Sequence, residues 1–245
     1  IQYQIAKTYA AQGNQKDAMN ALGTGVMYLQ SDFGIYNRTV ADYLSNQSAD
    51  FFISVGDTNR AANVANQAQF IYNKVGITPN DTAALHRIYG KIAFVRNEYN
   101  NAFENYQNAL DILRNTAEVN HSTYVKTILD IGEYYEHFNH SDLAISIYNE
   151  GIKKLDKDLV VAGHNRIALL IKLGKLYKAT EKYNKAQPLY EEAIRLIEKL
   201  PRTDLLHASI DDLYTELLAI YGETKEVVKQ RDLEAKILRK ERLGI

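Results

Sequence analysis

The feature that most constrains this chain is a pattern that recurs every 42 residues. Gly90, Gly132 and Gly174 mark the period, and the segments around them read YGKIAFVRNEYNNAFENYQNAL, IGEYYEHFNHSDLAISIYNEGI and LGKLYKATEKYNKAQPLYEEAI. Each glycine is followed twelve residues later by an alanine and four residues after that by a tyrosine. A period of this length is typical of stacked repeats, because one such unit is too small to bury its own apolar face.

Each repeat reads as two helices joined by a tight turn. Apolar residues recur at spacings of three and four within each half, which is helical periodicity. Short polar stretches such as Arg96-Asn97-Glu98 and Asn139-His140-Ser141 separate the halves and are suited to turns. The same pattern extends with decay in both directions. The sequence therefore predicts an all-α chain, a right-handed α-solenoid of about six helical hairpins and about twelve helices.

We expect one continuous array over residues 1–245, without a second domain. The repeats run approximately over residues 1–32, 33–76, 77–116, 117–157, 158–200 and 201–245. In the last repeat, polar residues replace the small and aromatic ones of the second helix, as expected of a capping element. We also expect each repeat glycine to face the following alanine, so that two helix backbones approach closely. Thr78-Pro79-Asn80-Asp81 is typical of a helix start, with a capping residue, a proline and an early acid.

Composition excludes several classes of function. The chain has 29 basic and 30 acidic residues and a net charge of −1, whereas nucleic-acid binding requires a basic excess on one face. The absence of cysteine excludes disulfides, thiolate zinc sites and cysteine nucleophiles. No apolar run is long enough to span a bilayer. Because the sequence begins with Ile1 and shows no signal segment, we expect a fragment or a processed product. We expect it to be soluble, and its cellular compartment is unknown.

The pattern resembles tetratricopeptide repeats over roughly residues 1–222. The 42-residue spacing is similar to the long repeats of kinesin light chains and of bacterial tetratricopeptide regulators, and the run KYNKAQPLY at 182–190 is especially like the light-chain type. The family has no fixed catalytic motif, so the resemblance implies a non-enzymatic scaffold that binds a protein or peptide in its concave groove.

Two alternatives to the scaffold remain open. One is a peptide-sensing regulator or a response-regulator phosphatase fragment, for which Gln47 is the only glutamine we consider able to orient a water molecule. The other is the sensor or docking arm of a larger multidomain enzyme.

In such arrays the first helix of each repeat lines the groove. The residues expected on this concave face, and predicted to bind the partner, are Asn46, Asp50, Arg87, Lys91, Lys126, Leu129, Glu133, His137, Ile171, Lys175 and Lys178. The set leans basic, so we expect a partner segment with acidic residues. An equally weighted alternative is a ladder of charges that neutralise one another between neighbouring repeats. Exposed pairs of this kind contribute only about 0–1 kcal/mol, so they would leave the side chains available.

No other type of site is predicted. Glu133 and His137 lie four residues apart and could both reach one metal ion, but no further ligands flank them at a zinc-site spacing. A polar groove wall is the preferred interpretation there. No serine, threonine or aspartate stands in a nucleophile setting, so we predict no catalytic residue, no metal and no cofactor.

Overall fold

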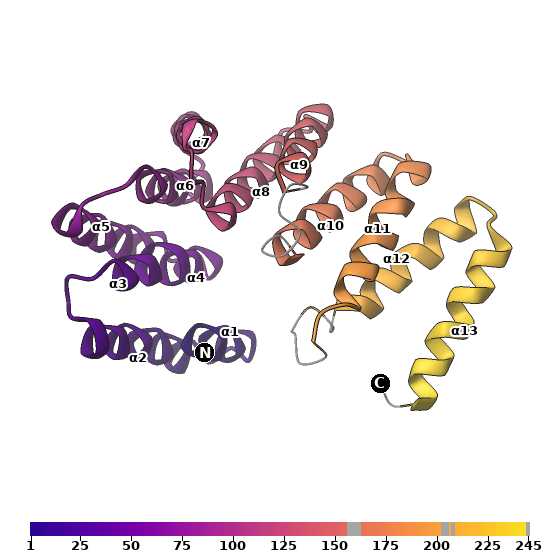
Figure 1. Ribbon diagram of the computed structural model, residues 1–245, viewed down its shortest axis with the longest axis horizontal. Helices are drawn as coiled ribbons and strands as arrows, with labels where there is room; N and C mark the ends of the chain where they lie inside the picture. Colours follow the sequence, from indigo (N-terminus) through magenta and orange to yellow (C-terminus); the bar gives the residue numbers. More distant parts are fainter. Residues whose placement is uncertain (156–162, 202–205, 207–208, 244–245) are drawn as a thin grey trace. The chain divides into compact units, whose positions relative to one another are not determined.

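The computed structural model describes residues 1–155, 163–201, 206 and 209–243, and all regular structure in that part of the chain is helical (Figure 1). The all-α prediction is confirmed. The chain divides into two compact units, which we call unit 1 (Ile1–Tyr134) and unit 2 (Tyr135–Ile245). None of the described helices is long and apolar enough to cross a bilayer.

Unit 1 holds the first seven α-helices, one short π-helical segment and most of α8. In chain order these are α1 (Gln2–Ala11), α2 (Gln15–Phe33), α3 (Arg38–Tyr43), η1 (Leu44–Ser48), α4 (Ala49–Ser54), α5 (Thr58–Val75), α6 (Pro79–Val95), α7 (Tyr99–Asn115) and α8 (His121–His137). Unit 2 continues from the end of α8 with α9 (Ser141–Leu155), α10 (Gly163–Ala179), α11 (Tyr183–Ile197), α12 (Ile210–Glu223) and α13 (Val227–Leu243).

The turns inside the helix pairs share one backbone feature. Each contains a single residue with a positive φ, which reverses the chain after the last helical turn. Glycine supplies it in the first two pairs, and other residues supply it later in the chain: Gly13, Gly56, Asn97, Asn139, Glu181 and Lys225. Their spacing follows the sequence repeat. The predicted start of α6 is also confirmed, because the Thr78 and Asp81 side chains form a reciprocal capping box with Pro79 in the first turn.

The repeat glycines allow close packing, as expected, but the neighbour that requires them is the tyrosine. A Cβ added at Gly90 would lie 2.6 Å from the Tyr106 ring and 3.1 Å from the Ala102 carbonyl oxygen. At Gly174 the closest atom would be in the Tyr190 ring, at 3.0 Å. At Gly90 and at Gly174, the tyrosine sixteen residues later therefore covers the glycine Cα.

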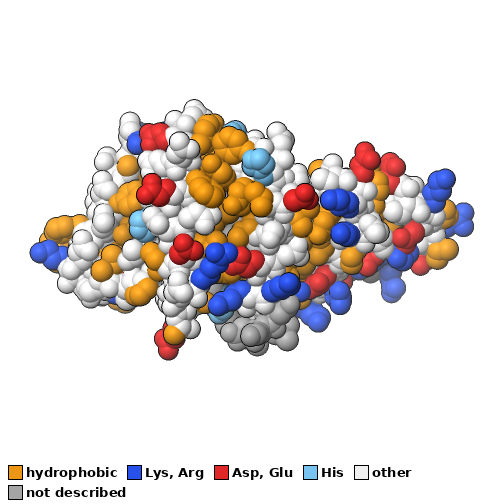
Figure 2. Space-filling model, turned by 90° about the horizontal axis from the view of Figure 1, so that it is seen from above, with side chains coloured by type: hydrophobic (Ala, Val, Ile, Leu, Met, Phe, Trp, Pro, Cys, Tyr) orange, Lys and Arg blue, Asp and Glu red, His pale blue; other side chains and the backbone are white. Residues whose placement is uncertain are grey.

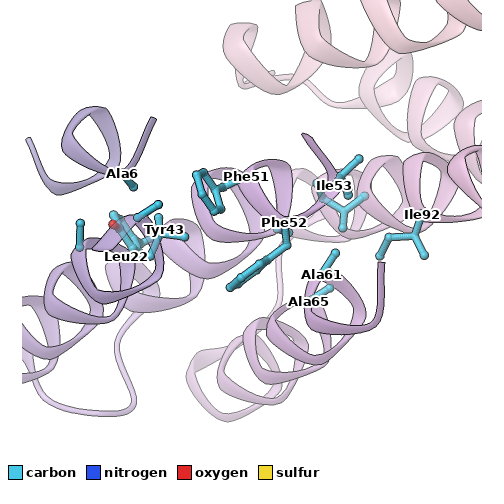
Figure 3. Close-up of a cluster of buried hydrophobic side chains, with 13 residues drawn as sticks. Ala6, Leu22, Tyr43, Phe51, Phe52, Ile53, Ala61, Ala65 and Ile92 are labelled. Atoms are coloured by element: carbon cyan, nitrogen blue, oxygen red, sulfur yellow. The ribbon is translucent and has the colours of Figure 1, made fainter. Parts of the chain in front are cut away.

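Separate apolar clusters stabilise each unit. In unit 1, side chains from α1 through α6 point toward one another around Leu22, Phe52 and Ala65 (Figure 3), and a second cluster surrounds Leu44 and Tyr72. In unit 2, one cluster joins α10, α11 and α12. Helix α13 contributes only partly buried side chains to that cluster, in keeping with the capping role predicted for the last helix.

Helix η1 is the main irregularity of unit 1. It joins α3 to α4 without a break in the chain direction, but its hydrogen bonds follow the wider π pattern over Leu44–Ser48. The first helix of the second repeat therefore has one residue more than a regular α-helix would need. This extra residue explains why the second repeat fits the sequence pattern loosely.

Candidate functional site

A pocket of about 410 Å³ lies beside η1 in unit 1. Five helical segments and the start of α8 contribute to its wall, which mixes polar and apolar surface. The lining residues are Leu29, Thr39, Asp42, Tyr43, Asn46, Gln47, Tyr72, Asn80, Asp81, Ala84, Asn120, Ser122, Thr123 and Lys126. This pocket is the candidate functional site.

The π-helical turn places two amides on the wall of the pocket. Ser45-Asn46-Gln47-Ser48 are mediocre helix formers in the middle of a long helix, and single π turns of this kind occur frequently at functional sites. The Asn46 amide donates to the Ser45 hydroxyl at 3.2 Å. Gln47 makes no side-chain hydrogen bond with any described residue. Its amide is therefore available to a ligand.

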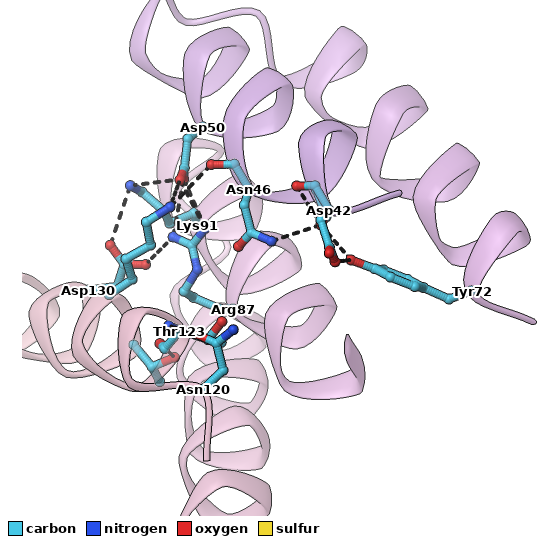
Figure 4. A network of polar contacts seen from close by, with 12 residues as sticks. Asp42, Asn46, Asp50, Tyr72, Arg87, Lys91, Asn120, Thr123 and Asp130 are labelled. Atoms are coloured by element: carbon cyan, nitrogen blue, oxygen red, sulfur yellow. Dashed lines mark hydrogen bonds and ion pairs between the residues drawn. The ribbon is translucent and has the colours of Figure 1, made fainter. Parts of the chain in front are cut away.

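A buried ion-pair network lies at one end of this wall (Figure 4). Its centre is Arg87, whose side chain is only 1% exposed. The guanidinium donates to both carboxylate oxygens of Asp50 at 3.0–3.1 Å and to Asp130 at 2.9 Å. Buried arginine requires such pairing. Arg87 on α6 thus connects the first helices of three successive repeats.

Two lysines complete the network. Lys91 lies 3.6 Å from Asp50 and 3.3 Å from Asp130, so it bridges the same carboxylates as Arg87. Lys126 donates to Asp50 at 3.2 Å and to the Asn46 carbonyl oxygen at 3.2 Å. Its side chain is 35% exposed and it lines the pocket. Lys126 is therefore the cation of the network that a ligand can reach.

The charges of the network shift the pKa values of its own members. Burial alone would raise the pKa of Asp50, but the surrounding cations, led by Arg87, outweigh burial and hold this pKa well below its ordinary value. Burial and the like charge of Arg87 lower the pKa of Lys126, despite the attraction of Asp50. Three cations share two carboxylates here, and Glu133 adds an attraction felt by Lys91.

The opposite end of the wall is formed by Asp42 and Tyr72. The Tyr72 hydroxyl donates to Asp42 at 2.7 Å and lies 3.1 Å from the Ser45 hydroxyl. Arg38, the cation near this end, is engaged elsewhere by Asp81 and the Gly76 carbonyl oxygen. Burial therefore raises the pKa of the half-buried Asp42 carboxyl, and the Tyr72 hydrogen bond only partly offsets this.

The N-terminal ends of α6 and α8 form the third side of the pocket. The Asn80 carboxamide oxygen accepts from the Asn120 amide at 2.9 Å, and its NH₂ donates to the Glu118 carbonyl oxygen at 2.8 Å. The Asn120 side chain in turn caps α8 by accepting from the Thr123 amide at 3.0 Å. These bonds fix the position of Ser122, whose hydroxyl has no hydrogen bond to a described residue.

The residues predicted for the groove separate into two groups. Asn46, Asp50, Arg87, Lys91 and Lys126 come together in unit 1, where the ladder of paired charges is the arrangement found. Arg87 is fully buried, so its role is to hold the network. Leu129 is partly buried and Glu133 is exposed, both on α8.

The other predicted residues belong to unit 2. His137 packs its ring against Phe138 with centroids 4.9 Å apart, and Lys178 pairs with Glu216 at 2.5 Å. Ile171 is partly buried and Lys175 is exposed. They do not form a network like that of unit 1 among the described residues of their unit.

Sequence reasoning missed the carboxylate and tyrosine at the far end of the pocket, Asp42 and Tyr72. It also did not recognise the pairing of Asp130 with Arg87. The signal available in the sequence was the stretch Ser45–Ser48, which interrupts an apolar helical pattern with four polar residues, three of them of modest helix propensity.

The chemistry of the pocket suits recognition. Free amides, a hydroxyl and one ammonium group provide both donors and acceptors, as peptide backbones require. In the described part of the chain, no three histidine or acidic side chains are placed to hold a metal ion. Basic and acidic side chains lie next to one another over much of the face seen in Figure 2, so no extended field of one sign covers it.

Comparison with known proteins places this geometry in a family. The family model of the soluble NSF attachment proteins (SNAP) matches residues 41–218, which is most of the chain and includes all the pocket-lining residues except Leu29 and Thr39. No curated protein sequence matches the chain.

Solved structures with similar folds share little sequence with the chain. BtubC (BKLC) from P. vanneervenii superposes with a TM-score of 0.69 at 17% identity, over 91% of this chain and 88% of its own. A signal transduction ATPase (STAND) protein with a tetratricopeptide repeat sensor, PH0952 from Pyrococcus horikoshii, gives 0.61 at 17% identity over 97% of this chain and 35% of its own. Aspartyl phosphate phosphatase F from Bacillus subtilis gives 0.61 at 14% identity, over 99% and 69%. The tetratricopeptide-like helical-repeat fold is thereby confirmed.

Proposed function

Because this chain belongs to the soluble NSF attachment protein family, we propose that it is a non-enzymatic scaffold that binds a segment of a partner protein in the unit 1 pocket. The family's name describes attachment to another protein, and the proposal keeps that class of activity without naming the partner. The chain spans about a third of the STAND protein that it resembles, so the activities of such larger proteins are not carried over.

One observation carries the proposal: the pocket beside η1 displays polar groups without partners. The amide of Gln47 and the hydroxyl of Ser122 are free among the described residues, and Lys126 offers a donor. These groups are at least partly exposed in the free chain, and a bound peptide backbone would offer them donors and acceptors alternately along its length. The π turn that presents Asn46 and Gln47 is consistent with a site maintained for binding.

The partner segment is proposed to carry an acidic residue beside Lys126. The network around Lys126 contains more cations than carboxylates, and a ligand carboxylate would be attracted to the reachable one. Such a contact would also raise the depressed pKa of Lys126. Lys91 is less available to a ligand carboxylate, because its ammonium group already bridges Asp50 and Asp130.

A random-sequence peptide array probed with the intact chain tests the scaffold. We expect bound peptides to lose about tenfold or more in affinity, or about 1.4 kcal/mol, with the double variant Gln47→Ala and Lys126→Met. The matched control is Lys153→Met, which removes an exposed lysine of unit 2 outside the predicted partner-binding set and should leave affinity unchanged. Peptides that bind the double variant as tightly as the unaltered chain would place the binding site elsewhere.

The second candidate is a role in signalling phosphate chemistry. It is favoured by one observation, the free amide of Gln47 on the pocket wall, together with the fold likeness to aspartyl phosphate phosphatase F. The test is incubation with a phosphorylated receiver domain. Accelerated phosphate release that disappears in Gln47→Ala would support this candidate, and unchanged phosphate release would remove it.

The third candidate, a sensor or docking arm of a larger enzyme, is suggested by the fold likeness to the STAND sensor. Reading the open reading frame on both sides of residues 1–245 would test it. A catalytic domain encoded in the same frame would support this role.

A further inference from the structure

The carboxylate of Asp42 stands apart from the other acids of the pocket region. Asp50 and Asp130 pair with Arg87, and Asp81 pairs with Arg38. Asp42 has no cation within 4.0 Å among the described residues, and its one polar contact is the hydrogen bond from Tyr72. Figure 4 shows this carboxylate beside the Tyr72 hydroxyl, at the end of the row that continues through Asn46 to Asp50.

An unpaired carboxylate in this position is unfavourable in the free chain. It is half-buried, lines the pocket and lies near the negative charge of Asp81, which disfavours its ionised form further. Arg38 is held by Asp81 and by the Gly76 carbonyl oxygen, so its charge offsets only part of the cost of ionising Asp42, to which it forms no ion pair. A cationic ligand group entering the pocket would gain a charge-assisted hydrogen bond with the carboxylate oxygen that Tyr72 leaves unoccupied.

We propose that Asp42 receives the basic side chain, lysine or arginine, of the segment bound in the unit 1 pocket. This inference rests on the proposed function. It adds the class of ligand residue that is recognised at the Asp42 end of the pocket. The pocket then has two oppositely charged ends: Asp42 would bind a basic residue of the ligand and Lys126 an acidic one. The side-chain amides of Asn46 and Gln47 lie between them and would bind the ligand backbone.

The geometry also sets the spacing of the two ligand groups. Asp42 and Asp50 are separated by eight residues of helix, a rise of about 12 Å, and the Lys126 ammonium lies between Asn46 and Asp50. An extended peptide covers about 3.3 Å per residue. We therefore expect the base and the acid about two to four residues apart in the bound segment.

The test uses the intact chain with Asp42→Asn, which removes the charge and keeps an oxygen that can accept from Tyr72. The control is Asp32→Asn, an exposed carboxylate of unit 1 outside the pocket. Binding peptides from the random array should be enriched in lysine or arginine two to four residues from an acid. Asp42→Asn should weaken them about tenfold, and the control should not. Replacing the peptide's arginine by citrulline should weaken binding to the unaltered chain equally and should not weaken Asp42→Asn further.

The outcomes separate this inference from the scaffold itself. Peptides that bind through Gln47 and Lys126 but show no basic enrichment, and bind Asp42→Asn normally, would overturn the inference and leave the scaffold intact. Absence of any peptide binding would overturn both. Nα-acetyl-arginine amide, which keeps only the guanidinium charge, serves as the small cationic probe. Binding of this compound as tightly as the peptides would make the site a receptor for small cationic molecules and overturn the assignment to a protein segment.

Discussion

Unit 1 and unit 2 are built from the same kind of helix pair but differ in what they bury. Of the polar or charged residues that are buried among the described residues, only Gln187 belongs to unit 2, and unit 1 holds Ser45, Ser48, Asp81, Arg87, Thr123, Thr127 and Asp130. The ion pairs described in unit 2, such as Lys178 with Glu216, remain partly exposed. Stacking of helix pairs therefore requires no buried charge, and the charged interior of unit 1 serves another purpose.

The largest expected effect tests the buried network. Arg87→Met would leave Asp50 and Asp130 buried with one cation fewer, and breaking a buried pair in this way typically costs about 3–5 kcal/mol. We expect urea unfolding to show this loss, with hydrogen exchange accelerated mainly in unit 1. The counterpart in unit 2, Lys178→Met, should cost no more than about 1 kcal/mol because its pair is exposed. Equal losses in the two variants would contradict the contrast between the units.

The second effect compares the two repeat glycines. Alanine at Gly90 would meet both the Tyr106 ring and the Ala102 carbonyl oxygen, whereas alanine at Gly174 would meet only the Tyr190 ring, at longer distance. Overpacking costs about 1–3 kcal/mol, and alanine regains up to about 1 kcal/mol of helix propensity. We expect Gly90→Ala to lower the melting temperature clearly and Gly174→Ala to change it little. The reverse order would show that the tyrosines can move aside.

The smallest effect concerns Asp42 and its pH dependence. The folded chain raises the pKa of this carboxyl above the unfolded value of about 3.9, so ionisation at neutral pH destabilises the fold. Asp42→Asn should therefore raise the free energy of unfolding at pH 7, by a small amount because solvent screens this half-exposed carboxyl. The gain should vanish as the pH falls through the raised pKa toward 3.9. Asp212→Asn, an exposed carboxylate of unit 2, is the control for denaturant titrations over this range, and a gain of the same size there would refute the assignment.

Much of the fold was predictable because it depends on local periodicity. The glycine, alanine and tyrosine positions predicted the helix pairs, and Thr78 to Asp81 predicted the start of α6. The candidate site was only half predictable. Asp50 and Lys91 occupy equivalent positions in successive repeats, and Arg87 and Lys126 fall on the same predicted groove face, so these four could be grouped from the sequence. The burial of Arg87 depends on how three helices converge. Asp42 was missed because η1 changes the helical register between it and Asp50, and Tyr72 because it lies on α5, the second helix of its repeat, where no groove residue was expected.

The π turn also has a consequence for how such sites arise. One residue more in a helix rotates everything before it by about 100° relative to everything after it. Thus Val40 and Leu44 join one apolar cluster while Phe51 and Phe52 join another, and the polar residues at the junction open onto the pocket. One inserted residue is enough to bring polar side chains of a structural repeat onto the wall of a pocket. A repeat that falls out of phase by one residue is therefore a place to look for a binding site in related sequences. Deleting Gln47 would remove the extra residue and restore a regular α-helix.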